Sequence, residues 1–424
     1  MSGPAHTDVE VAIVGGGMVG ASLALALAGS GRRVALIEAV VADAAEQPSF
    51  DDRTSALGNG SRRIFEALGV WQHLQPHAGP VREIRVSDAG HFGAARLTAA
   101  EQGLDALGYV VSNRHIGAAL WRQLAAHPEI LVRCPARVLE VQLGAEGVQL
   151  TIRAGAGATA GAEADAHALV AAAERLSARV VVAADGAQSL VRSAAGISAM
   201  VEDYRQVAVV VHVATDRPAT GIAYERFTST GPLAVLPLAD GHYTVVWTVA
   251  PERATQLLAL ADAEFISDLQ RGFGWRIGRI VRAGARASYP LRLSRADGLT
   301  GARAVLVGNA AQALHPVAGQ GFNLGLRDAA LLAEVLAAAP DPGAPAVLED
   351  YERRRGTDRR GMIGFTDGLV KLFASERPFV SAARGAGLLL FDIAPAAKRA
   401  LSRLSWGFGG DSPRLMRGLP PGEP

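Results

Sequence analysis

The feature that most constrains the fold is a glycine-rich turn between a strand pattern and a helix pattern near the N-terminus. Residues 9–14 are mostly apolar and β-branched, and GGGMVG and the alanine- and leucine-rich run ASLALALAGSG follow them. A second apolar run, RRVALIEA, comes next. A strand period, a helix ended by glycine and another strand together predict a βαβ unit.

The glycines of this turn have the spacing of a phosphate-binding loop. Gly15, Gly17 and Gly20 form G-x-G-x-x-G directly after the first strand. The first glycine permits a tight turn, the second admits a pyrophosphate to the backbone, and the third lets helix pack on strand. Glu38 ends the second strand, where a carboxylate can accept hydrogen bonds from ribose hydroxyls and disfavours a 2′-phosphate. The sequence predicts bound FAD or NAD rather than NADP.

Composition narrows the remaining function classes. The 424 residues are 49% hydrophobic, and 42 basic residues nearly balance 41 acidic ones, so no chain-wide basic field is available for nucleic acid. Cys134 is the single cysteine, which excludes an intramolecular disulfide and a thiolate metal cluster, and no histidine or carboxylate cluster predicts a metal site. Without a leader pattern or a long apolar run, a cytoplasmic protein is expected, peripheral at the inner face of a membrane at most.

The pattern of periodicities predicts an α/β protein assembled from discontinuous pieces. Strand and helix patterns alternate at both ends, whereas the middle carries antiparallel β patterns such as GPLAVLPLADGHYTVVWTV. We expect a Rossmann-like nucleotide-binding domain from residues 1–80, 106–192 and 293–375, a substrate domain from 81–105 and 193–292, and a helical tail over 376–424. The alanine- and glycine-rich run 154–174 is expected to be a surface insertion.

Two further motifs follow strand patterns. AADGAQSLVR contains Asp185 and Gly186, and by itself it also fits a strand-ending turn with a helix cap. The segment GNAAQALHPVAGQGFN is an unusually long, polar strand-to-helix connection. The residues of interest in it are Gly308, Asn309, His315, Pro316, Gly319, Gln320, Gly321 and Asn323.

Together, the three motifs resemble the single-component FAD-dependent aromatic hydroxylases, the para-hydroxybenzoate hydroxylase fold class. Within that class, FDDRTSALGNGS, FTSTGPLAVLPLADGHYTVVWT and GNAAQALHPVAGQGFNLGLRDA resemble the ubiquinone-biosynthesis hydroxylases. The form GNAAQ is most similar to the 2-polyprenyl-6-methoxyphenol hydroxylase branch. The resemblance runs from Val9 to about Phe373, and the tail fits it as well.

The resemblance implies an FAD-dependent monooxygenase with a mostly antiparallel substrate domain. NAD(P)H or another donor would reduce the flavin, dioxygen would form a flavin C4a-hydroperoxide, and one oxygen atom would pass to the ring of a polyprenylated phenol. Three alternatives stay open: an FAD hydroxylase of a small soluble aromatic, a non-catalytic flavin-binding scaffold subunit, and an NAD-dependent Rossmann enzyme.

The resemblance also implies roles for individual residues. Arg53 is expected near the flavin and the substrate entrance, Arg114 on the FAD phosphates or adenine, and Asp185 between flavin and pyrophosphate. The loop from Gly308 to Asn323 is expected to wrap the flavin, with His315 and Pro316 beside the ring and Asn309 in place of the family's usual aspartate. The expected substrate wall opposite the flavin is Leu233, Leu236, Pro237 and Trp247.

The C-terminal tail has the composition of an interfacial helix. Leu388 to Phe391 and Ile393 are apolar, Arg384, Lys398, Arg399 and Arg403 flank them, and Trp406 and Phe408 follow. We expect the tail to bring the protein to a membrane or to a partner that holds the lipid substrate. The alternative is that it caps the protein's own core or forms a dimer contact.

Overall fold

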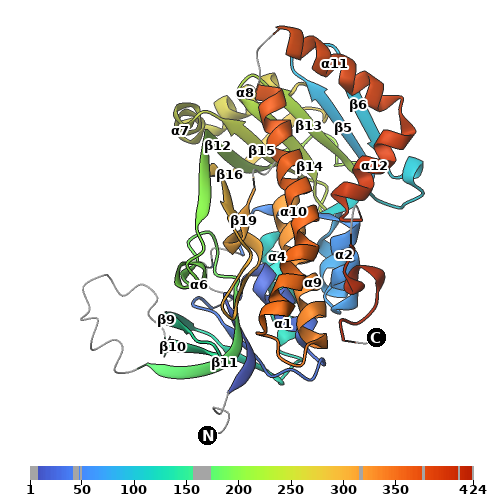
Figure 1. Ribbon diagram of the computed structural model, residues 1–424. Coiled ribbons are helices and arrows are strands. Elements are labelled where there is room, and N and C mark those ends of the chain that lie inside the picture. The colour runs from blue at the N-terminus through green and yellow to red at the C-terminus, as the bar shows by residue number, and fades with distance from the viewer. Residues whose placement is uncertain are drawn as a thin grey trace, which may run out of the picture.

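The fold was analysed in a computed structural model of the chain (Figure 1), which describes residues 8–41, 47, 50–155, 173–314, 319–374, 378–408 and 411–422. Most of the predicted surface insertion, together with His315 and Pro316, lies outside the described residues.

The first sheet contains the predicted βαβ unit. β1 (Val9–Val14) lies between β2 (Val34–Ile37) and β11 (Glu174–Ala183), and both pairings are parallel. The sheet continues with β8 (Ile130–Arg133) beside β2, β18 (Ala304–Leu306) beside β11, β17 (Thr300–Gly301) at the edge and the antiparallel extension β9 (Ala136–Leu143) and β10 (Val148–Ala154). The central strands are buried along nearly their whole length, as expected for parallel strands covered on both faces.

Helices from distant parts of the sequence cover this sheet (Figure 1). α1 (Met18–Leu27) packs against α9 (Gln320–Ala338) and α4 (Asn113–Leu124), and α10 (Pro345–Ala374) packs on α9. Shorter helices are α2 (Asn59–Ala67), α3 (Trp71–Leu74) and α6 (Leu190–Ala194). Single 3₁₀ turns occur at Gln75–His77, Ala100–Gln102, Gly308–Ala310 and Arg414–Arg417.

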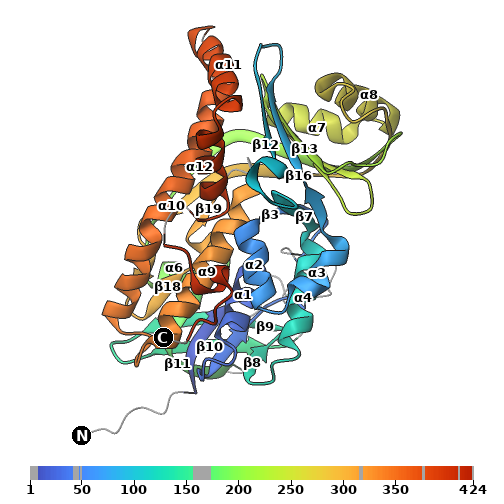
Figure 2. The same cartoon turned by 90° about the vertical axis from the view of Figure 1, so that its right-hand side faces the viewer.

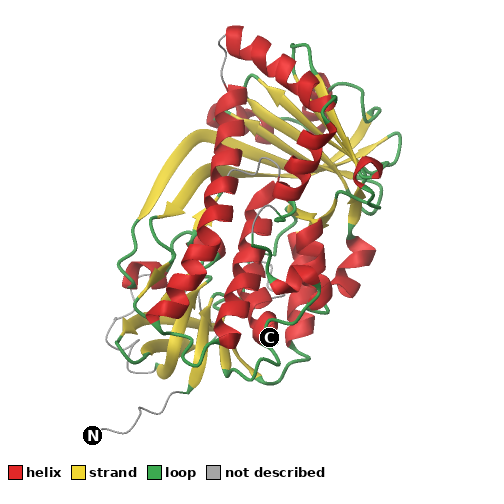
Figure 3. Ribbon diagram, turned by 45° about the vertical axis from the view of Figure 1, so that its right-hand side comes forward, coloured by secondary structure: helices red, strands yellow, loops and turns green. Residues whose placement is uncertain are grey.

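The second sheet is mostly antiparallel. Its strands, in spatial order, are β19 (Gln312–Ala313), β16 (Ile280–Ala296), β12 (Ala199–Thr215), β15 (Tyr243–Val249), β14 (Gly231–Pro237), β13 (Ile222–Thr228), β5 (Glu83–Asp88) and β6 (Ala94–Thr98). α7 (Pro251–Ala259) and α8 (Asp262–Phe273) bury one face of it in a separate apolar core. Figure 3 shows this sheet on top of the helical layer.

A small sheet connects the two larger ones. In it β7 (Gly108–Ser112) pairs with β3 (Thr54–Gly58) and β4 (Gly79–Val81). Because β5 and β6 join the strands of residues 199–296, sheet membership supports the proposed grouping of residues 81–105 with 193–292. β19 also joins this sheet from within the motif after β18. The domain division remains our proposal.

The C-terminal tail separates into two parts (Figure 2). α11 (Pro378–Asp392) lies along the β5–β6 hairpin, and a Cβ on Gly385 would stand 2.4 Å from the carbonyl oxygen of Phe92. α12 (Pro395–Ser405) then returns to the helical layer, where Trp406 Nε1 donates to the Leu107 carbonyl at 2.8 Å. Among the described residues, none of the helices has the length and apolar character needed to cross a bilayer.

Candidate active site

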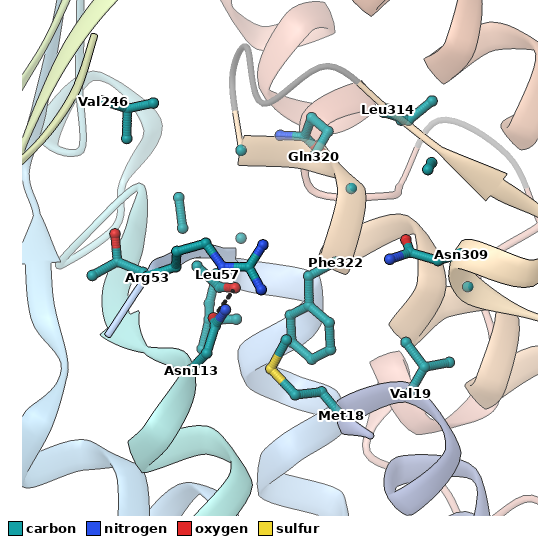
Figure 4. A pocket seen from close by; sticks show the side chains of 18 of the residues that line it. Met18, Val19, Arg53, Leu57, Asn113, Val246, Asn309, Leu314, Gln320 and Phe322 are labelled. Carbon is teal, nitrogen blue, oxygen red and sulfur yellow. Dashed lines mark hydrogen bonds between the residues drawn. The ribbon is translucent and has the colours of Figure 1, made fainter. Parts of the chain in front are cut away.

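A single cavity of about 1360 Å³ connects all three sheets. Typical small-molecule pockets measure about 300–1,000 Å³, so this one has room for a large cofactor and a second molecule. Its walls come from the glycine turn, the ends of β2 and β11, the loop before α9, β3, and the inner face of the second sheet. Figure 4 shows Arg53, Asn113, Asn309, Gln320 and Val246 around this space.

The glycine turn is shaped by close backbone contacts. Gly15 has φ +103°, and a Cβ there would lie 2.4 Å from the Ala184 carbonyl oxygen. A Cβ on Gly20 would lie 1.9 Å from the Gly15 carbonyl oxygen. Gly15 and Gly17 line the cavity, while Gly20 lets α1 pack beneath the turn. Only glycine fits these two positions, because backbone atoms lie where a side chain would start. They belong to the residues after β11 at Gly15 and to the turn itself at Gly20.

Glu38 lines the cavity at the end of β2. Its carboxylate accepts hydrogen bonds from the Gly16 amide at 2.5 Å and the Val40 amide at 2.9 Å. The acid therefore fixes the glycine turn against β2 and keeps acceptor capacity toward the cavity, since a carboxylate has about four lone-pair sites.

The contacts of Asp185 fit both interpretations of its motif, the helix cap and the cofactor contact. One carboxylate oxygen accepts from the Leu190 amide at 2.8 Å, at the start of α6. The other, Oδ1, is buried and has no partner within the described residues. Burial raises the pKa of this carboxyl, and the hydrogen bonds around it only partly offset that effect. The turn contributes to the cap of α6 and also presents an unsatisfied acceptor to the cavity.

A buried charge network holds the loop after β18. Asp328 of α9 accepts from the Gly308 amide at 3.1 Å and from Gln312 Nε2 at 2.7 Å, and it pairs with Arg355 of α10. Arg359 donates to Gln312 Oε1 at 2.8 Å. Asn309 is left facing the cavity, as Figure 4 shows. The long polar connection is thus positioned by two helices behind it.

The loop ends where α9 begins. Gly319, Gln320 and Gly321 line the cavity, and a Cβ on Gly321 would meet no atom within 4 Å. The first turn of a helix presents free amides and a partial positive charge. An electron-rich edge of a bound ring is therefore favoured at this point.

The side chain of Asn323 is engaged by other parts of the chain. Its Oδ1 accepts from the Gly58 amide at 2.9 Å and Ser61 Oγ at 2.6 Å, and its Nδ2 donates to the carbonyls of Ala56 at 2.7 Å and Gly319 at 2.8 Å. These bonds use the full hydrogen-bonding capacity of an amide. Asn323 fastens β3 and α2 to α9, and these contacts do not support a role of its side chain at the cofactor.

The two candidate arginines differ in position. Arg53 lines the cavity, pairs with Asp51 at 2.6 Å and stacks over the Tyr289 ring at 4.5 Å. Figure 4 shows its guanidinium directed inward. Arg114 is not among the lining residues; its side chain is 65% exposed and pairs with Asp52, which is also exposed. The prediction for Arg114 is therefore not supported, and Asn113 and Arg137 line the cavity in its neighbourhood.

Most of the residues predicted for the substrate wall lie one position away, along their strands, from the residues that line the cavity. Leu236 lines the cavity, but Leu233 and Trp247 point to the other face and pack against α7 and α8, and Pro237 is not among the lining residues. Successive side chains of a strand alternate between faces, so the cavity receives the opposite set. That set includes Glu225, Ala234, Val246 and Thr248. The two-residue period of side-chain direction along these strands was the signal that could have identified them.

The cavity continues into an apolar arm beneath the C-terminal helices. Ile84 and Val86 of β5 and Leu97 of β6 face Leu388 and Phe391 of α11. Leu401 and Trp406 line it as well. Leu388, Phe391 and Trp406 were expected on a docking surface or, in the alternative, against the protein's own core, and all three line the cavity.

The residues present fit FAD. The glycine turn, Glu38 and the unsatisfied Asp185 oxygen suit a dinucleotide, and the open start of α9 suits a flavin edge. No group of three His, Cys, Asp or Glu side chains within the described ranges is arranged to hold a metal ion.

Comparison with known proteins agrees with this site. A family model described as FAD binding domain matches residues 8–365. Ubiquinone hydroxylase UbiL of Rhodospirillum rubrum is 37% identical over 432 residues, covering 99% of this chain and 95% of that protein. The 3-demethoxyubiquinol 3-hydroxylase of Escherichia coli is 33% identical, covering 95% of this chain and 99% of that protein.

Solved structures show the same fold. The p-nitrophenol 4-monooxygenase PnpA of Pseudomonas putida superposes with a TM-score of 0.76 at 21% identity, covering 96% of this chain and 99% of that one. The chain belongs to the FAD-dependent aromatic hydroxylases and, within them, to the ubiquinone-biosynthesis hydroxylase family. The predicted family, fold class and FAD cofactor are confirmed, and the protein is an FAD-dependent monooxygenase that uses a reductant and dioxygen.

Proposed function

We propose that this enzyme hydroxylates the aromatic ring of a polyprenylated phenol in ubiquinone biosynthesis. The observation that carries the proposal is the continuity of one cavity from the glycine turn, past the start of α9, to the second sheet and the apolar arm. Reduced FAD supplies the activated oxygen when it is bound. The chain's own residues bind the cofactor, orient the ring and exclude water.

The adenosine half of FAD fits between the glycine turn and Glu38, and the flavin fits between Arg53 and Gln320. Gly15, Gly17, Glu38 and Asp185 supply the turn, the ribose acceptor and the buried polar edge. Gly186, Gly308, Asn309, Gly319 and Gly321 complete the proposed cofactor site. His315 and Pro316 lie outside the described residues, and their place beside the ring stays a prediction.

The apolar arm supports a substrate with a prenyl chain. Ile84, Val86, Leu97, Leu388 and Phe391 offer it only hydrocarbon surface, and burying such surface contributes about 25 cal/mol per Å². A small soluble aromatic would not occupy this arm. The ring then lies against the second sheet while the chain passes toward α11.

The outside of α11 supports membrane docking. Leu390 is 65% exposed and Ile393 is 76% exposed, and Phe92 of the β5–β6 turn, 82% exposed, lies beside the helix at Gly385. We define Phe92, Leu389, Leu390 and Ile393 as the outer apolar patch. Arg399 and Arg403 are exposed nearby in the chain. Such a patch next to the apolar arm would let a lipid substrate pass from a bilayer into the cavity.

Other parts of the tail do not contribute to this patch. Lys398, one of the expected membrane-facing cations, is 5% exposed and pairs with Asp392 at 3.1 Å. Trp406 and Phe408 pack toward α2, with Arg63 stacked over Phe408 at 5.6 Å. For these three residues the alternative, that the tail caps the protein's own core, agrees with their contacts.

Product analysis tests the proposed function. The FAD-loaded enzyme is given NAD(P)H, dioxygen and a series of 2-alkenylphenols with none to several prenyl units, and products are identified by mass spectrometry. We expect hydroxylated product whose kcat/KM rises with chain length. A deletion strain should accumulate an intermediate lacking one ring hydroxyl, and the missing position identifies the hydroxylated carbon. Equal turnover of phenol itself and its prenylated forms would favour the small-aromatic alternative.

A further inference from the structure

Glu225 is an ionisable side chain in an apolar stretch of the cavity wall. It lies in the middle of β13, where it pairs with Ala234 of β14 and Val86 of β5. Ala223 and Phe227, two residues away on either side, also line the cavity. Val246 follows Ala234 on the next strand and faces the centre of the cavity in Figure 4. At about 4.8 Å per strand, Glu225 lies roughly 10 Å from Val246 along the sheet.

No basic side chain within the described residues neutralises Glu225. Its neighbours Tyr224 and Arg226 point to the other face, where they bond the carbonyls of Arg276 and Gly272 of the α8 region. Arg85 of β5 also lies on that face, over the Tyr224 ring. The described basic residues that line the cavity are Arg53, which is paired with Asp51, Arg96 of β6 and Arg137 of β9. None of them forms an ion pair with Glu225, whose pKa is shifted by burial alone.

Burial without a partner raises the pKa of Glu225 to about 7. Residual exposure of the side chain comes from the cavity that it lines. A buried carboxylate without a hydrogen bond is costly, and a carboxyl that titrates near neutrality in a cavity is suited to exchange a proton with a ligand.

We propose that Glu225 is a catalytic residue that accepts the hydrogen bond and then the proton of the substrate's phenolic hydroxyl. This inference rests on the proposed function, because it needs a phenol in the cavity. It adds the ring-activating base to that function.

The proton transfer balances within the substrate and Glu225. The phenolic O–H bond breaks, a bond forms between that hydrogen and a Glu225 carboxylate oxygen, and the electron pair stays on the phenol oxygen. The resulting phenolate donates electron density to its ring, which favours attack on an electrophilic oxygen at the ortho or para carbon. No oxidant or reductant is involved in this step.

Other cavity groups are less suited to this proton. Glu38 is engaged by two backbone amides, and Asp51, which does not line the cavity but lies beside Arg53, is engaged by Arg53 and by the Tyr289 hydroxyl at 3.4 Å. Asp185 shares its carboxylate with the start of α6. Glu225 has no such bond in the described part of the chain, and it lies between the centre of the cavity and the apolar arm.

The test compares FAD-loaded wild type with Glu225→Gln, using a 2-prenylphenol and its O-methyl ether as probes. Glu140→Gln, on an exposed position of β9, is the control. We expect wild-type kcat/KM to fall below a midpoint near the pKa of about 7. In Glu225→Gln this acid limb should vanish and kcat/KM should drop by about 10²- to 10⁴-fold, the usual contribution of a general base. Glu225→Asp should recover part of the rate.

Binding gives a readout that does not need turnover. Dissociation constants are measured for both probes from the change in flavin absorbance, and FAD content and the rate of flavin reduction serve as checks of folding. Wild type should prefer the phenol to its ether above pH 7, and Glu225→Gln should lose the pH dependence of that preference. An unchanged acid limb and an unchanged preference in Glu225→Gln would overturn the proposal. Absent hydroxylation by wild type with a preserved preference would instead contradict the proposed function alone.

Discussion

Arg355 of α10 and Asp328 of α9 form an ion pair at 2.6 Å in which each side chain is only 2% exposed. The same carboxylate accepts from the Gly308 amide and from Gln312, so one buried acid joins two helices to the loop that faces the cavity. The loop sequence alone does not reveal this support, because its partners follow it by 16 to 47 residues.

We expect Asp328→Asn to destabilise the protein by about 3 to 5 kcal/mol, the usual cost of breaking a buried ion pair from one side. It should also weaken FAD retention, because the loop loses its anchor. Thermal unfolding and flavin content measure both effects. Glu66→Gln, which breaks the exposed pair with Arg62, is the control and should cost less than about 1 kcal/mol. Equal effects of the two substitutions would contradict the anchoring role.

Asp185→Ala should reduce the affinity for FAD by roughly 1 to 3 kcal/mol, because a buried polar group of the cofactor would lose its partner. The apparent Kd, measured by recovery of flavin fluorescence, reports the change. Ser189→Ala removes the hydroxyl that caps α6 by accepting from the Arg192 amide at 2.9 Å. Ser189 does not line the cavity, although its hydroxyl lies close enough to Asp185 to offset part of the rise in pKa that burial causes in that carboxyl. If Ser189→Ala lowers the affinity for FAD as much as Asp185→Ala does, Asp185 acts only through the helix.

Glu225 should make the stability of the substrate-free protein depend on pH. Between its ordinary pKa of 4.5 and its folded pKa of about 7, the folded protein holds a proton that the unfolded chain has lost, so stability falls as pH rises. Glu225→Gln removes this contribution. The difference in Tm, variant minus wild type, should increase from pH 4.5 to about 7 and then level off. A difference that stays constant with pH would mean that Glu225 is not buried without a partner.

The two faces of the second sheet should respond differently to substitution. Ala234→Phe fills the cavity and should lower kcat/KM for a prenylated phenol while FAD binding is kept. Trp247→Ala opens the core beneath α8, where Trp247 packs against Phe265, and should cost about 3 to 5 kcal/mol of stability. Steady-state kinetics and denaturant unfolding separate the effects. If Ala234→Phe lowered stability and Trp247→Ala lowered kcat/KM instead, Trp247 and not Ala234 would lie on the substrate side.

Leu390→Ser combined with Ile393→Ser should reduce sedimentation with anionic liposomes without loss of FAD. Each side chain removed from the outer apolar patch lowers the apolar area that a bilayer can bury. Val201→Ser combined with Trp275→Ser, two exposed apolar residues outside the patch, is the control. Point variants are used here because removing the whole tail, with Trp406, would uncover α2. Unchanged sedimentation of the patch variant would exclude docking through α11, and binding to a carrier protein would then be tested.

Local sequence determined the nucleotide-binding part of this protein. Gly20 is required by a contact within the strand-to-helix turn and Gly15 by the positive φ of that turn, so their spacing is visible in the chain itself. The close approach of Ala184 to Gly15 is a tertiary contact. The family resemblance added the flavin, the fold class and the chemistry. Asp185 was found in the same way, because its turn and its helix cap lie within a few residues of each other.

Tertiary structure decided the rest, because side-chain direction and burial depend on residues far away in sequence. A shift of one residue along a strand reverses the face, so Trp247 entered the core of α7 and α8 while Val246 entered the cavity. The side-chain amide of Asn323 is hydrogen-bonded to residues of β3 and α2, more than 260 residues earlier in the chain. Glu225 gained its raised pKa only when β5, β14 and the apolar cavity wall removed water around it.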